Sequence, residues 1–377
     1  MSNDEALGIL EVLGSGSGFI RRKDAGYIPS NDDIYVGARV IQKFGLRSGD
    51  ELMGDVGKRP KNGKSPPLTH LRTVNGRPPE EARRRPEFNR LSAMHPDQQL
   101  KLECGRTVMG KPDYTNRVID LFCPFGKGQR AMIVALAKAG KTMVMQSVAE
   151  GITTNHPECT LFFLLVDERP EEVTEMESCG FGEVVASTFD RSADRHTAVA
   201  EMTLERARRR VEMGDDVVII LDSITRLARA YNTSEEGSGR TLSGGLDANS
   251  LEKPKRFLGS ARKAQGGGSL TIVATALVDT GSRMDQVIFE EFKGTGNSEL
   301  LLSREMADRR IYPAIDLTAS ATRKEELLLS EDALSLSRAL RRQLSDMPPA
   351  DAMTELMGVM KRMPTNADLI DYYKQRV

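Results

Sequence analysis

The sequence predicts an α/β protein in which a small β-rich segment precedes a larger domain built on a parallel sheet. Residues 8–76 contain short apolar or alternating runs separated by Gly, Asp, Asn and Pro, a pattern typical of strands joined by turns. From about residue 105 onward, apolar strand-like runs alternate with amphipathic helical patterns, which indicates a parallel sheet covered on both faces. The C-terminal end has a mainly helical pattern, interrupted by "MPP" and "MPT".

The first segment is predicted to be a small barrel such as an OB-fold. Five short strands in about seventy residues suit that architecture. Apolar or alternating runs at 8–13, 18–22, 33–41 and 51–56 supply the clearest strands. We expect three units along the chain: a β domain over 1–76, a Pro- and charge-rich connector over 77–102, and an α/β domain over 103–377.

The α/β domain shows its elements through hydrophobic periodicity. Buried strands are predicted at 130–136, 160–168, 216–222 and 269–277. Two helices are predicted from apolar stripes at helical spacing, one made by Val144, Met145, Val148, Ala149 and Ile152, the other by Ala200, Leu204, Ala207 and Val211.

Composition excludes several classes of protein. The formal net charge is −1, 39% of residues are hydrophobic, and no apolar run approaches the ~20 residues that span a bilayer. The N-terminal segment "MSNDEALGIL" lacks the pattern of a secretion signal. The four cysteines and four histidines form no ligand cluster in sequence, so we expect neither zinc nor disulfides, no membrane, and a cytoplasmic location.

One stretch is strongly basic despite the neutral total. Between Gly57 and Arg90 there are ten Lys or Arg and three Glu. Charge runs are usually solvated surface, but nucleic-acid binding depends on where charge lies rather than on the net value. A solvated linker and a phosphate-binding surface both remain open.

The segment 135–142, "ALAKAGKT", lies between a predicted strand and a predicted helix. A loop in this position can bind phosphate through its backbone N–H groups and the N-terminus of the helix. Lys141 is then expected to reach the β- and γ-phosphates, and the Thr142 hydroxyl to ligate Mg²⁺. A chance run of small and basic residues is the alternative. Ala135, where the common pattern has Gly, weakens the prediction if that position needs a positive φ.

Two acidic residues follow buried strands of the same domain. Asp222 ends the strand at 216–222, and Glu168 ends the strand at 160–168. Carboxyl ends of parallel strands lie where such sheets bind ligands, and an ATPase needs acids to hold Mg²⁺ through water and to orient the attacking water. Each acid alone is also explained as a surface or turn residue. Together with the loop they predict a nucleoside triphosphatase.

Longer segments give the chain a family resemblance. In order, they read "KAGKT", "DERPEEVTEM", "LDSITRLARAYN", "GGLDAN", "FKGTGN" and "YPAIDLTASATRKEELL". The chain closely resembles the transcription termination factor Rho family from about Gly8 to its C-terminus. The resemblance implies a cold-shock-like OB-fold followed by a RecA-like motor domain. It also implies a homohexameric, RNA-dependent ATPase and 5′→3′ RNA–DNA helicase that binds single-stranded RNA and releases transcripts from the RNA polymerase elongation complex.

The resemblance assigns roles in the ATP site residue by residue. Glu168 matches the water-activating acid, with Arg169 beside it, and Asp222 the acid that supports Mg²⁺. Met143 and Tyr312 match positions that sandwich the adenine. Arg310 and Arg323 match arginines that reach the nucleotide of the neighbouring subunit, and such donors stabilise transition-state charge. Further nucleotide contacts implied by the resemblance are Lys138, Ala139, Gly140, Lys141, Thr142 and Arg226.

The resemblance also implies two RNA-binding regions. In the barrel, Phe19, Arg21 and Tyr35 match residues that stack bases or steer the backbone. Ser17 and, with a less certain alignment, Ser65 stand where the family usually has further aromatics, so we expect weaker or less pyrimidine-selective capture. Two loops are expected to face a central pore, with Arg240, Ser243 and Gly244 in one and Thr280 and Arg283 in the other.

Two alternatives remain, together with one departure in the phosphate loop. A rotary-type hexameric ATPase would share the acidic strand-end motif, and an RNA-binding ring with impaired ATP hydrolysis would explain an altered loop. The family loop usually begins Ala-Pro-Pro, so Ala135 is expected there. Leu136 and Ala137 replace the two prolines. Because proline restricts the unbound chain, their loss predicts somewhat weaker nucleotide affinity.

Overall fold

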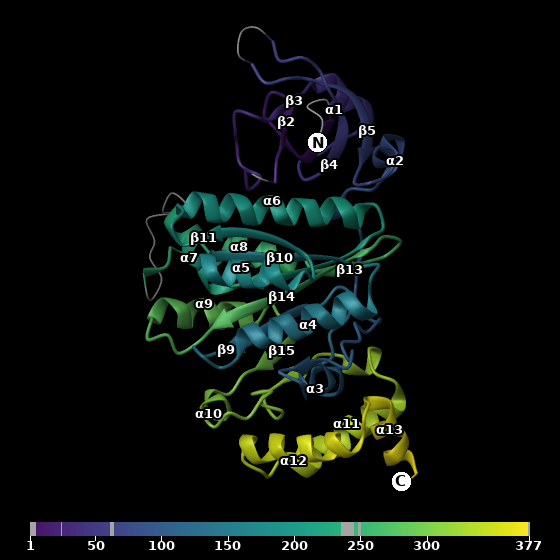
Figure 1. Ribbon diagram of the computed structural model, residues 1–377, viewed down its shortest axis with the longest axis vertical. Coiled ribbons are helices and arrows are strands. Elements are labelled where there is room, and N and C mark those ends of the chain that lie inside the picture. The colour runs from purple at the N-terminus through teal and green to yellow at the C-terminus, as the bar shows by residue number, and fades with distance from the viewer. Residues whose placement is uncertain (1–4, 24, 61–63, 235–244, 248–249, 376–377) are drawn as a thin grey trace.

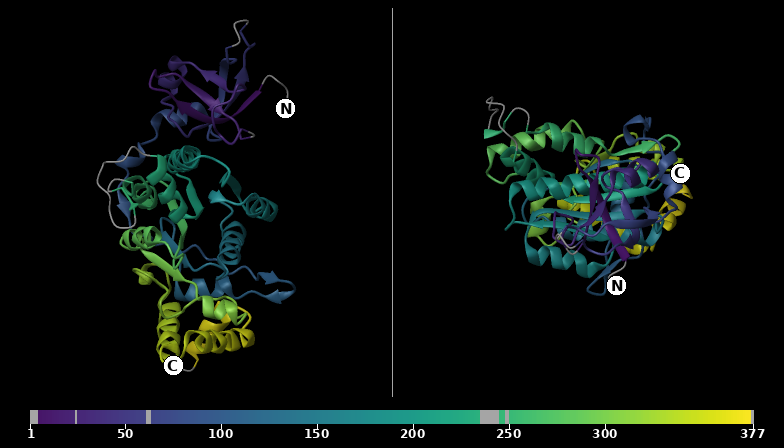
Figure 2. Two further views of the ribbon diagram at one scale, coloured as in Figure 1. Left: turned by 90° about the vertical axis from the view of Figure 1, so that its left-hand side faces the viewer. Right: turned by 90° about the horizontal axis from the view of Figure 1, so that it is seen from above.

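The computed structural model describes residues 5–23, 25–60, 64–234, 245–247 and 250–375. An N-terminal β domain lies at one end of the long axis, a large sheet with its helices in the middle, and the C-terminal helices at the other end (Figures 1 and 2). In the described ranges, no helix is long and apolar enough to cross a membrane.

The N-terminal domain is the predicted OB-like barrel. Its antiparallel sheet has the order β3-β2-β1-β4-β5, and a bridge between Tyr35 and Pro67 joins the two end strands. Leu10, Ile20 and Leu52 fill its core. Its elements are β1 (Glu5–Val12), β2 (Gly18–Arg21), β3 (Ile34–Val36), α1 (Ala38–Phe44), β4 (Glu51–Val56) and β5 (Leu68–Val74).

The strand prediction for 33–41 is wrong beyond Val36. β3 ends there, Gly37 caps the start of α1, and α1 closes the barrel by burying Ile41 in its core. The apolar run is compatible with a strand or with a strand followed by a helix. A strand would place Val36 and Ile41, five positions apart, on opposite faces, whereas the strand–helix arrangement buries both in one core. Tertiary packing decides between them.

The segment after the barrel is structured and joins both domains. It contains α2 (Pro79–Arg84), a 3₁₀ turn (Phe88–Arg90) and β6 (Ala93–Met94). Ala82 of α2 is buried in the core of the barrel, whereas β6 pairs with β13 (Arg262–Ala264) at the margin of the large sheet. The barrel is therefore fixed to the larger domain through both ends of this segment.

The large sheet is parallel over β11-β10-β12-β14-β9-β15, with β16 antiparallel at one edge. Phe163 and Leu165 are buried on one face, and Phe162 and Leu164 on the other, which explains the continuous apolar run in β10. The predicted strands and both predicted helical stripes are confirmed. The elements are α3 (Thr115–Phe122), β9 (Arg130–Ala135), α4 (Lys141–Asn155), β10 (Thr160–Glu168), α5 (Pro170–Cys179), β11 (Glu183–Thr188), α6 (Ala193–Glu212), β12 (Asp216–Asp222), α7 (Ile224–Ser234), α8 (Glu252–Gly259), β14 (Ser269–Leu277), α9 (Arg283–Lys293), β15 (Ser298–Leu301), α10 (Arg304–Asp308) and β16 (Ala321–Thr322).

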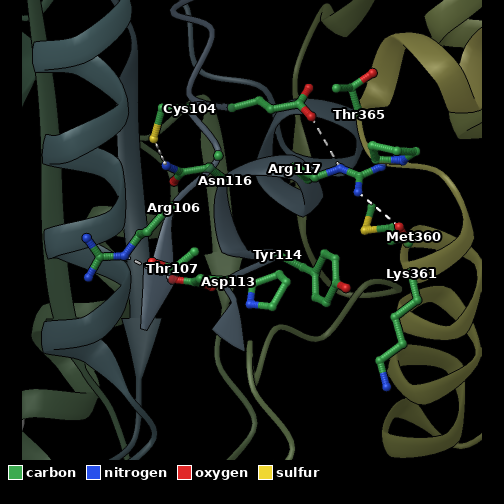
Figure 3. A pocket seen from close by; sticks show the side chains of 14 residues that line it. Cys104, Arg106, Thr107, Asp113, Tyr114, Asn116, Arg117, Met360, Lys361 and Thr365 are labelled. Carbon is green, nitrogen blue, oxygen red and sulfur yellow. Dashed lines mark hydrogen bonds and ion pairs between the residues drawn. The ribbon is translucent and has the colours of Figure 1, made fainter. Parts of the chain in front are cut away.

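The C-terminal helices are α11 (Glu331–Leu344), α12 (Pro349–Arg362) and α13 (Asn366–Lys374). A cavity of about 670 Å³ lies between the end of α12, the start of α3 and the hairpin β7 (Thr107–Val108)–β8 (Lys111–Pro112) (Figure 3). Arg117 on its wall binds the side chain of Asn366 at 3.0 Å and the carbonyls of Met360 and Met363 at 3.1 and 2.9 Å. These bonds make Arg117 a structural link between α3 and the C-terminal helices.

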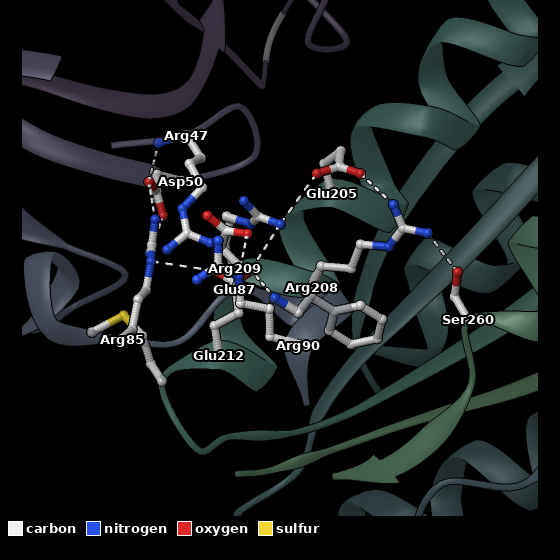
Figure 4. A network of polar contacts seen from close by, with 12 residues as sticks. Arg47, Asp50, Arg85, Glu87, Arg90, Glu205, Arg208, Arg209, Glu212 and Ser260 are labelled. Atoms are coloured by element: carbon white, nitrogen blue, oxygen red, sulfur yellow. Dashed lines mark hydrogen bonds and ion pairs between the residues drawn. The ribbon is translucent and has the colours of Figure 1, made fainter. Parts of the chain in front are cut away.

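The barrel packs against α6, and ion pairs join the barrel and the segment after it to the end of this helix (Figures 1 and 4). Arg85 donates two bonds to Asp50, at 2.5 and 2.6 Å, and Glu212 at the end of α6 lies 2.9 Å from Nη1 of Arg47. Gly49 has φ +93° and lies against α6, where an added Cβ would come within 2.4 Å of the Glu205 carbonyl carbon. Glycine at this turn therefore permits the close approach of the barrel to α6.

Candidate nucleotide-binding site

The predicted phosphate loop connects β9 to α4. Ala135 is the last residue of β9 and does not have a positive φ, so the replacement of the usual glycine costs nothing there. The positive φ values occur at Lys138 (66°) and Gly140 (91°), and Gly140 caps the N-terminus of α4. The Gly140 position lies against Tyr312, with an added Cβ 3.4 Å from the ring. A loop with its glycine at the helix N-terminus is the arrangement that binds phosphate.

Lys141 is shared between two buried carboxylates at the ends of neighbouring strands. Its Nζ donates to Oδ2 of Asp222 and lies 3.4 Å from Oε1 of Glu168. Because β10 pairs with β12 so that Leu165 faces Asp222, both acids reach the same edge of the sheet. Thr275 of β14 fixes Asp222 by donating its hydroxyl to Oδ1 at 2.7 Å. The lysine and both acids that the sequence predicted are thus brought together.

Glu168 is buried with few bonds. It is 1% exposed, its Oε2 accepts no hydrogen bond from any described residue, and Nη1 of Arg226 lies 3.4 Å from that oxygen. Burial raises the pKa of Glu168, and the neighbouring Asp222 carboxylate raises it further, while Lys141 and Arg226 act in the opposite direction. A carboxylate held with little hydrogen bonding is available to accept a proton or to orient water.

The donor set at this edge fits Mg²⁺. Glu168, Asp222 and Glu172 of α5 each offer a carboxylate oxygen, and these oxygens lie within 4.8 Å of one another. Thr142, in the first turn of α4, adds a half-buried hydroxyl on the next residue after Lys141. Magnesium prefers such hard oxygen ligands and usually keeps several waters. Glu172 is a member that the sequence reasoning missed, although it lies within the quoted "DERPEEV".

A cavity of about 480 Å³ adjoins these acids. Arg169, Arg226 and Thr280, all predicted site residues, line it together with Asp167 and Phe189. Arg229 and Asp285 also line this cavity and were not predicted from the sequence. Asp285 accepts from Arg229 at 2.6 and 2.7 Å and from the Thr280 hydroxyl at 2.5 Å. Arg229 lies within the quoted "SITRLARAYN", but its partner 56 residues away left no local signal.

The two predicted adenine contacts are placed at the start of α4 and beside the loop. Met143 is 37% exposed, and the Tyr312 ring packs at Gly140. Arg310 precedes Tyr312 by two residues and is exposed, and its side chain forms no hydrogen bond or ion pair with any residue in the described ranges. It therefore lies on the same edge of the sheet as the loop of its own chain.

Arg323 lies near the other end of the parallel strands, where β9 begins. Its backbone N–H donates to Asn297, whose own N–H donates to Arg130 at the first residue of β9. The phosphate loop follows the last residue of β9, six residues later. At about 3.3 Å per residue the two ends of β9 are roughly 17 Å apart. The Arg323 side chain is exposed, and its backbone lies about one strand length from the phosphate loop of its own chain.

The predicted RNA contacts of the barrel lie together on β2 and β3. Phe19 and Tyr35 pair across the strands with ring centroids 5.8 Å apart and planes at 69°. Arg21 is 6% exposed, packs 5.2 Å from the Phe19 ring, and is held by Glu11 and Asp33. We call the Phe19 and Tyr35 rings the aromatic platform. Tyr35 is 38% exposed, so its ring is accessible to a base, and the two rings pack edge to face.

The two loops predicted to contact RNA in the pore are described unequally. Arg240, Ser243 and Gly244 lie outside the described residues. Arg283 is the first residue of α9 and is exposed, and Thr280 is fixed by Asp285.

Comparison with known proteins gives two domain matches. Residues 6–80 match the RNA-binding domain of the Rho termination factor, and residues 115–322 match the nucleotide-binding domain of the ATP synthase alpha/beta family. Transcription termination factor Rho of Cereibacter sphaeroides is 51% identical over 97% of this chain and 86% of its own length. The Rho proteins of Escherichia coli K12 and Streptomyces lividans are 51% and 54% identical over 98% and 96% of this chain, and over 87% and 51% of their own lengths.

Solved structures confirm the fold of the larger domain. An ATPase of a bacterial type III secretion system superposes with a TM-score of 0.59 at 23% identity, covering 76% of this chain and 77% of that one. The ATPase EscN, solved with its central stalk EscO, gives 0.54 at 25% identity over 69% of this chain and 59% of that one.

Fold and site together define a RecA-like ATP-hydrolysing enzyme with an OB-fold ahead of its motor domain. The identity over nearly the whole chain then separates it from the secretion ATPases, which share the fold alone. The chain belongs to the transcription termination factor Rho family.

Proposed function

We propose that this protein is an RNA-dependent ATPase and 5′→3′ RNA–DNA helicase that terminates transcription by releasing transcripts from RNA polymerase. The observation that carries the proposal is the 51% identity to Rho proteins across 97–98% of the chain, with Lys141, Glu168 and Asp222 assembled at one sheet edge. We divide the chain into an RNA-binding barrel over 1–76, a connector over 77–102 and a motor over 103–377.

In the proposed reaction Lys141 changes partners. Without nucleotide it neutralises Asp222 and Glu168. When ATP binds, Lys141 moves to the β- and γ-phosphates, and the loop N–H groups bind the remaining phosphate oxygens. Thr142 and, through water, Asp222 would hold Mg²⁺, which would neutralise phosphate charge. Release of Lys141 leaves Glu168 free to orient and activate the attacking water, with Arg226 beside it.

The catalytic site is proposed to be completed by a second subunit. Arg323 lies about one strand length from its own phosphate loop, so it serves a nucleotide only in a ring of copies. This geometry supports the homohexamer. A role in trans for Arg310 rests on the family resemblance alone, because Arg310 lies beside its own loop. Met143 and Tyr312 hold the adenine, and Arg169 contacts the phosphate region.

Phe19 and Tyr35 are proposed to capture single-stranded RNA, with Arg21 supporting Phe19 from behind. Thr280 and Arg283, with the loop that carries Arg240, Ser243 and Gly244, then contact RNA in the pore. The Thr280 hydroxyl and Arg229 share Asp285. Since α7, which carries Arg229, begins two residues after Asp222, this pair links the proposed RNA loop to the nucleotide acids.

The test is ATP hydrolysis measured with and without RNA homopolymers, using Lys141→Ala as the control. We expect hydrolysis that requires RNA in the native chain and background rates in the variant. Turnover independent of RNA would favour a rotary-type ATPase, and equal background rates in both proteins would favour a ring that binds RNA without hydrolysing ATP.

A further inference from the structure

A buried histidine outside the assigned nucleotide contacts lies behind the catalytic edge. His196, in the second turn of α6, is 6% exposed. Its Nδ1 lies 2.7 Å from Oγ of Ser187 on β11, and its Nε2 faces Oδ1 of Asp167 at 3.9 Å. Asp167 immediately precedes Glu168, so a chain of polar contacts runs from β11 through α6 to the residue before the water-activating acid.

Asp167 is the extra residue of a β-bulge. β10 and β11 pair in parallel with Val166 opposite Ser187, but Glu168 is then opposite Thr188, so Asp167 has no counterpart. Its φ is 57°, a conformation that non-glycine residues adopt infrequently and that Asp tolerates better than most. Bulges beside active sites re-aim side chains, and strained residues persist where their surroundings fix them.

The bulge determines where Glu168 points. Glu168 has few bonds of its own, since Lys141 and Arg226 each approach only to 3.4 Å, and Lys141 must leave when nucleotide binds. Its position must therefore come from the backbone of residues 166–168 and from what holds the Asp167 side chain. Nε2 of His196 lies 3.9 Å from Oδ1 of that side chain.

We propose that His196 is a positioning residue for ATP hydrolysis, which holds the Asp167 bulge and so keeps the Glu168 carboxylate aimed at the attacking water. The inference rests on the proposed function, and it adds a residue of α6 to the site.

The chemistry of the contact follows from burial. Desolvation lowers the pKa of His196, so the ring is neutral and carries one proton. When the Ser187 hydroxyl donates to Nδ1, the proton resides on Nε2 and faces Asp167. The 3.9 Å between Nε2 and Oδ1 is longer than a hydrogen bond, and catalytic contacts of this kind tighten in the substrate complex.

Two variants separate the two ring nitrogens. His196→Gln reaches the Nε2 position with an amide that can face Asp167, whereas His196→Asn reaches only the Nδ1 position and keeps the Ser187 contact. Both remove the ring from the same buried site. We expect kcat for RNA-stimulated ATP hydrolysis to fall about 10- to 100-fold in His196→Asn, as for a catalytic group displaced by about an ångström. His196→Gln should stay within a few-fold of the native rate, and KM for ATP should be unchanged in both.

A second measurement shows whether His196 acts through Asp167. Asp167→Gly keeps the positive φ without a side chain, because glycine adopts that conformation freely. In the Asp167→Gly background, His196→Asn should cause no further loss of kcat, since the two residues act as one unit.

Several outcomes would overturn the inference. These are equal kcat values for the Gln and Asn variants, a loss confined to KM, a loss that follows a lowered unfolding temperature, or additive effects of Asp167→Gly and His196→Asn. The native chain is assayed in parallel. If it hydrolyses ATP with RNA and the variants behave in one of these ways, the inference alone fails, whereas an inactive native chain would refute the proposed function and the inference together.

Discussion

Two buried carboxylates, Asp50 of the barrel and Glu168 of the motor domain, have very different surroundings. Asp50, where the barrel meets the motor, is fully buried and accepts two bonds from Arg85, one from Asn75 and one from the backbone of Arg47. Glu168, at the nucleotide edge, is equally buried, but its nearest cations stand 3.4 Å away and one oxygen accepts no hydrogen bond from a described residue.

The difference separates a structural charge from a reactive one. A carboxylate with every lone pair satisfied is fixed in place and fixes its neighbours. A carboxylate with unsatisfied lone pairs can receive a proton or a water without breaking existing bonds. α6 (Ala193–Glu212) joins the two sites, since the helix rises about 24 Å from His196, near the nucleotide acids, to Glu212 at the barrel.

The largest expected effect is at the nucleotide end. Glu168→Gln keeps the shape of the side chain but removes the charge that is proposed to activate water. We expect RNA-stimulated kcat to fall about 10²- to 10⁴-fold. The free energy of unfolding should not fall, because the carboxylate makes few bonds and its raised pKa shows that folding disfavours the charged form. Steady-state ATPase rates and urea unfolding measure the two quantities. If Glu168→Gln lowers stability but keeps its ATPase activity, Glu168 is a structural carboxylate and not a reactive one.

The barrel end should respond in the opposite way. Asp50→Ala removes both hydrogen bonds that Arg85 donates to Asp50 and leaves this buried guanidinium, 2% exposed, with only Glu212 at 3.3 Å from its Nε. We expect a loss of about 3–5 kcal/mol in the free energy of unfolding. The paired replacement Asp50→Leu with Arg85→Met should recover most of that loss, because apolar pairs often replace buried ion pairs at little cost. If the single and paired variants are equally unstable, packing rather than charge holds the junction.

RNA capture by the barrel should improve when missing aromatics are restored. Ser65 is followed by Pro66, whose carbonyl accepts from the backbone of Tyr35, so Ser65→Tyr places a ring beside the open platform. We expect binding of the full chain to short RNA oligomers to tighten by about 1–3 kcal/mol for each newly stacked base. Tyr35→Ala is the matched control and should weaken binding by a similar amount. Tight, cytosine-specific binding by the native chain would contradict the view that its platform is reduced.

The pH dependence of stability offers a smaller test of the same contrast. The pKa of Glu168 is raised in the folded state, so the folded protein keeps this proton where the unfolded chain has released it. Its stabilising contribution is full below the unfolded pKa of about 4.3 and is lost as pH rises through the folded value. Relative to Glu168→Gln, the native chain should therefore lose stability with rising pH, by at most about 1.4 kcal/mol per pH unit. If the free energy of unfolding changes with pH equally in the two proteins, the pKa of Glu168 is not shifted by folding.

The features that the sequence predicted are those encoded locally. Continuous apolar runs predicted β10 and β12 because both faces of a parallel sheet are buried, and a strand, a glycine-containing loop and a helix predicted the phosphate site. The acids Glu168 and Asp222 were found because they end predicted strands. Each of these signals lies within a few residues of the feature it predicts.

The features that were missed depend on pairing between distant segments. The Asp167 bulge exists only because β10 pairs with β11, and Arg85 meets Asp50 across 35 residues. Arg21 was predicted as an RNA contact from the family resemblance, and its burial between Glu11 and Asp33 follows from how β2 packs. Sequence periodicity carries no record of such contacts.

The smallest predicted effect concerns the loop itself. Leu136 and Ala137 stand where the family has prolines, neither has a positive φ, and Ala137 precedes the left-handed Lys138. Proline at 137 would hold residue 136 extended, which suits the end of β9. Restoring both prolines should tighten ATP binding by about 0.4–1 kcal/mol per residue, since the unbound loop loses freedom. Titration with ATP at fixed Mg²⁺ measures this. Leu136→Ala is the control, because it removes the same side chain without stiffening the backbone. If the double-proline variant binds ATP no more tightly than Leu136→Ala, the entropy of the free loop does not limit nucleotide affinity. The contrast between the Asp50 and Glu168 sites then depends on their charges alone.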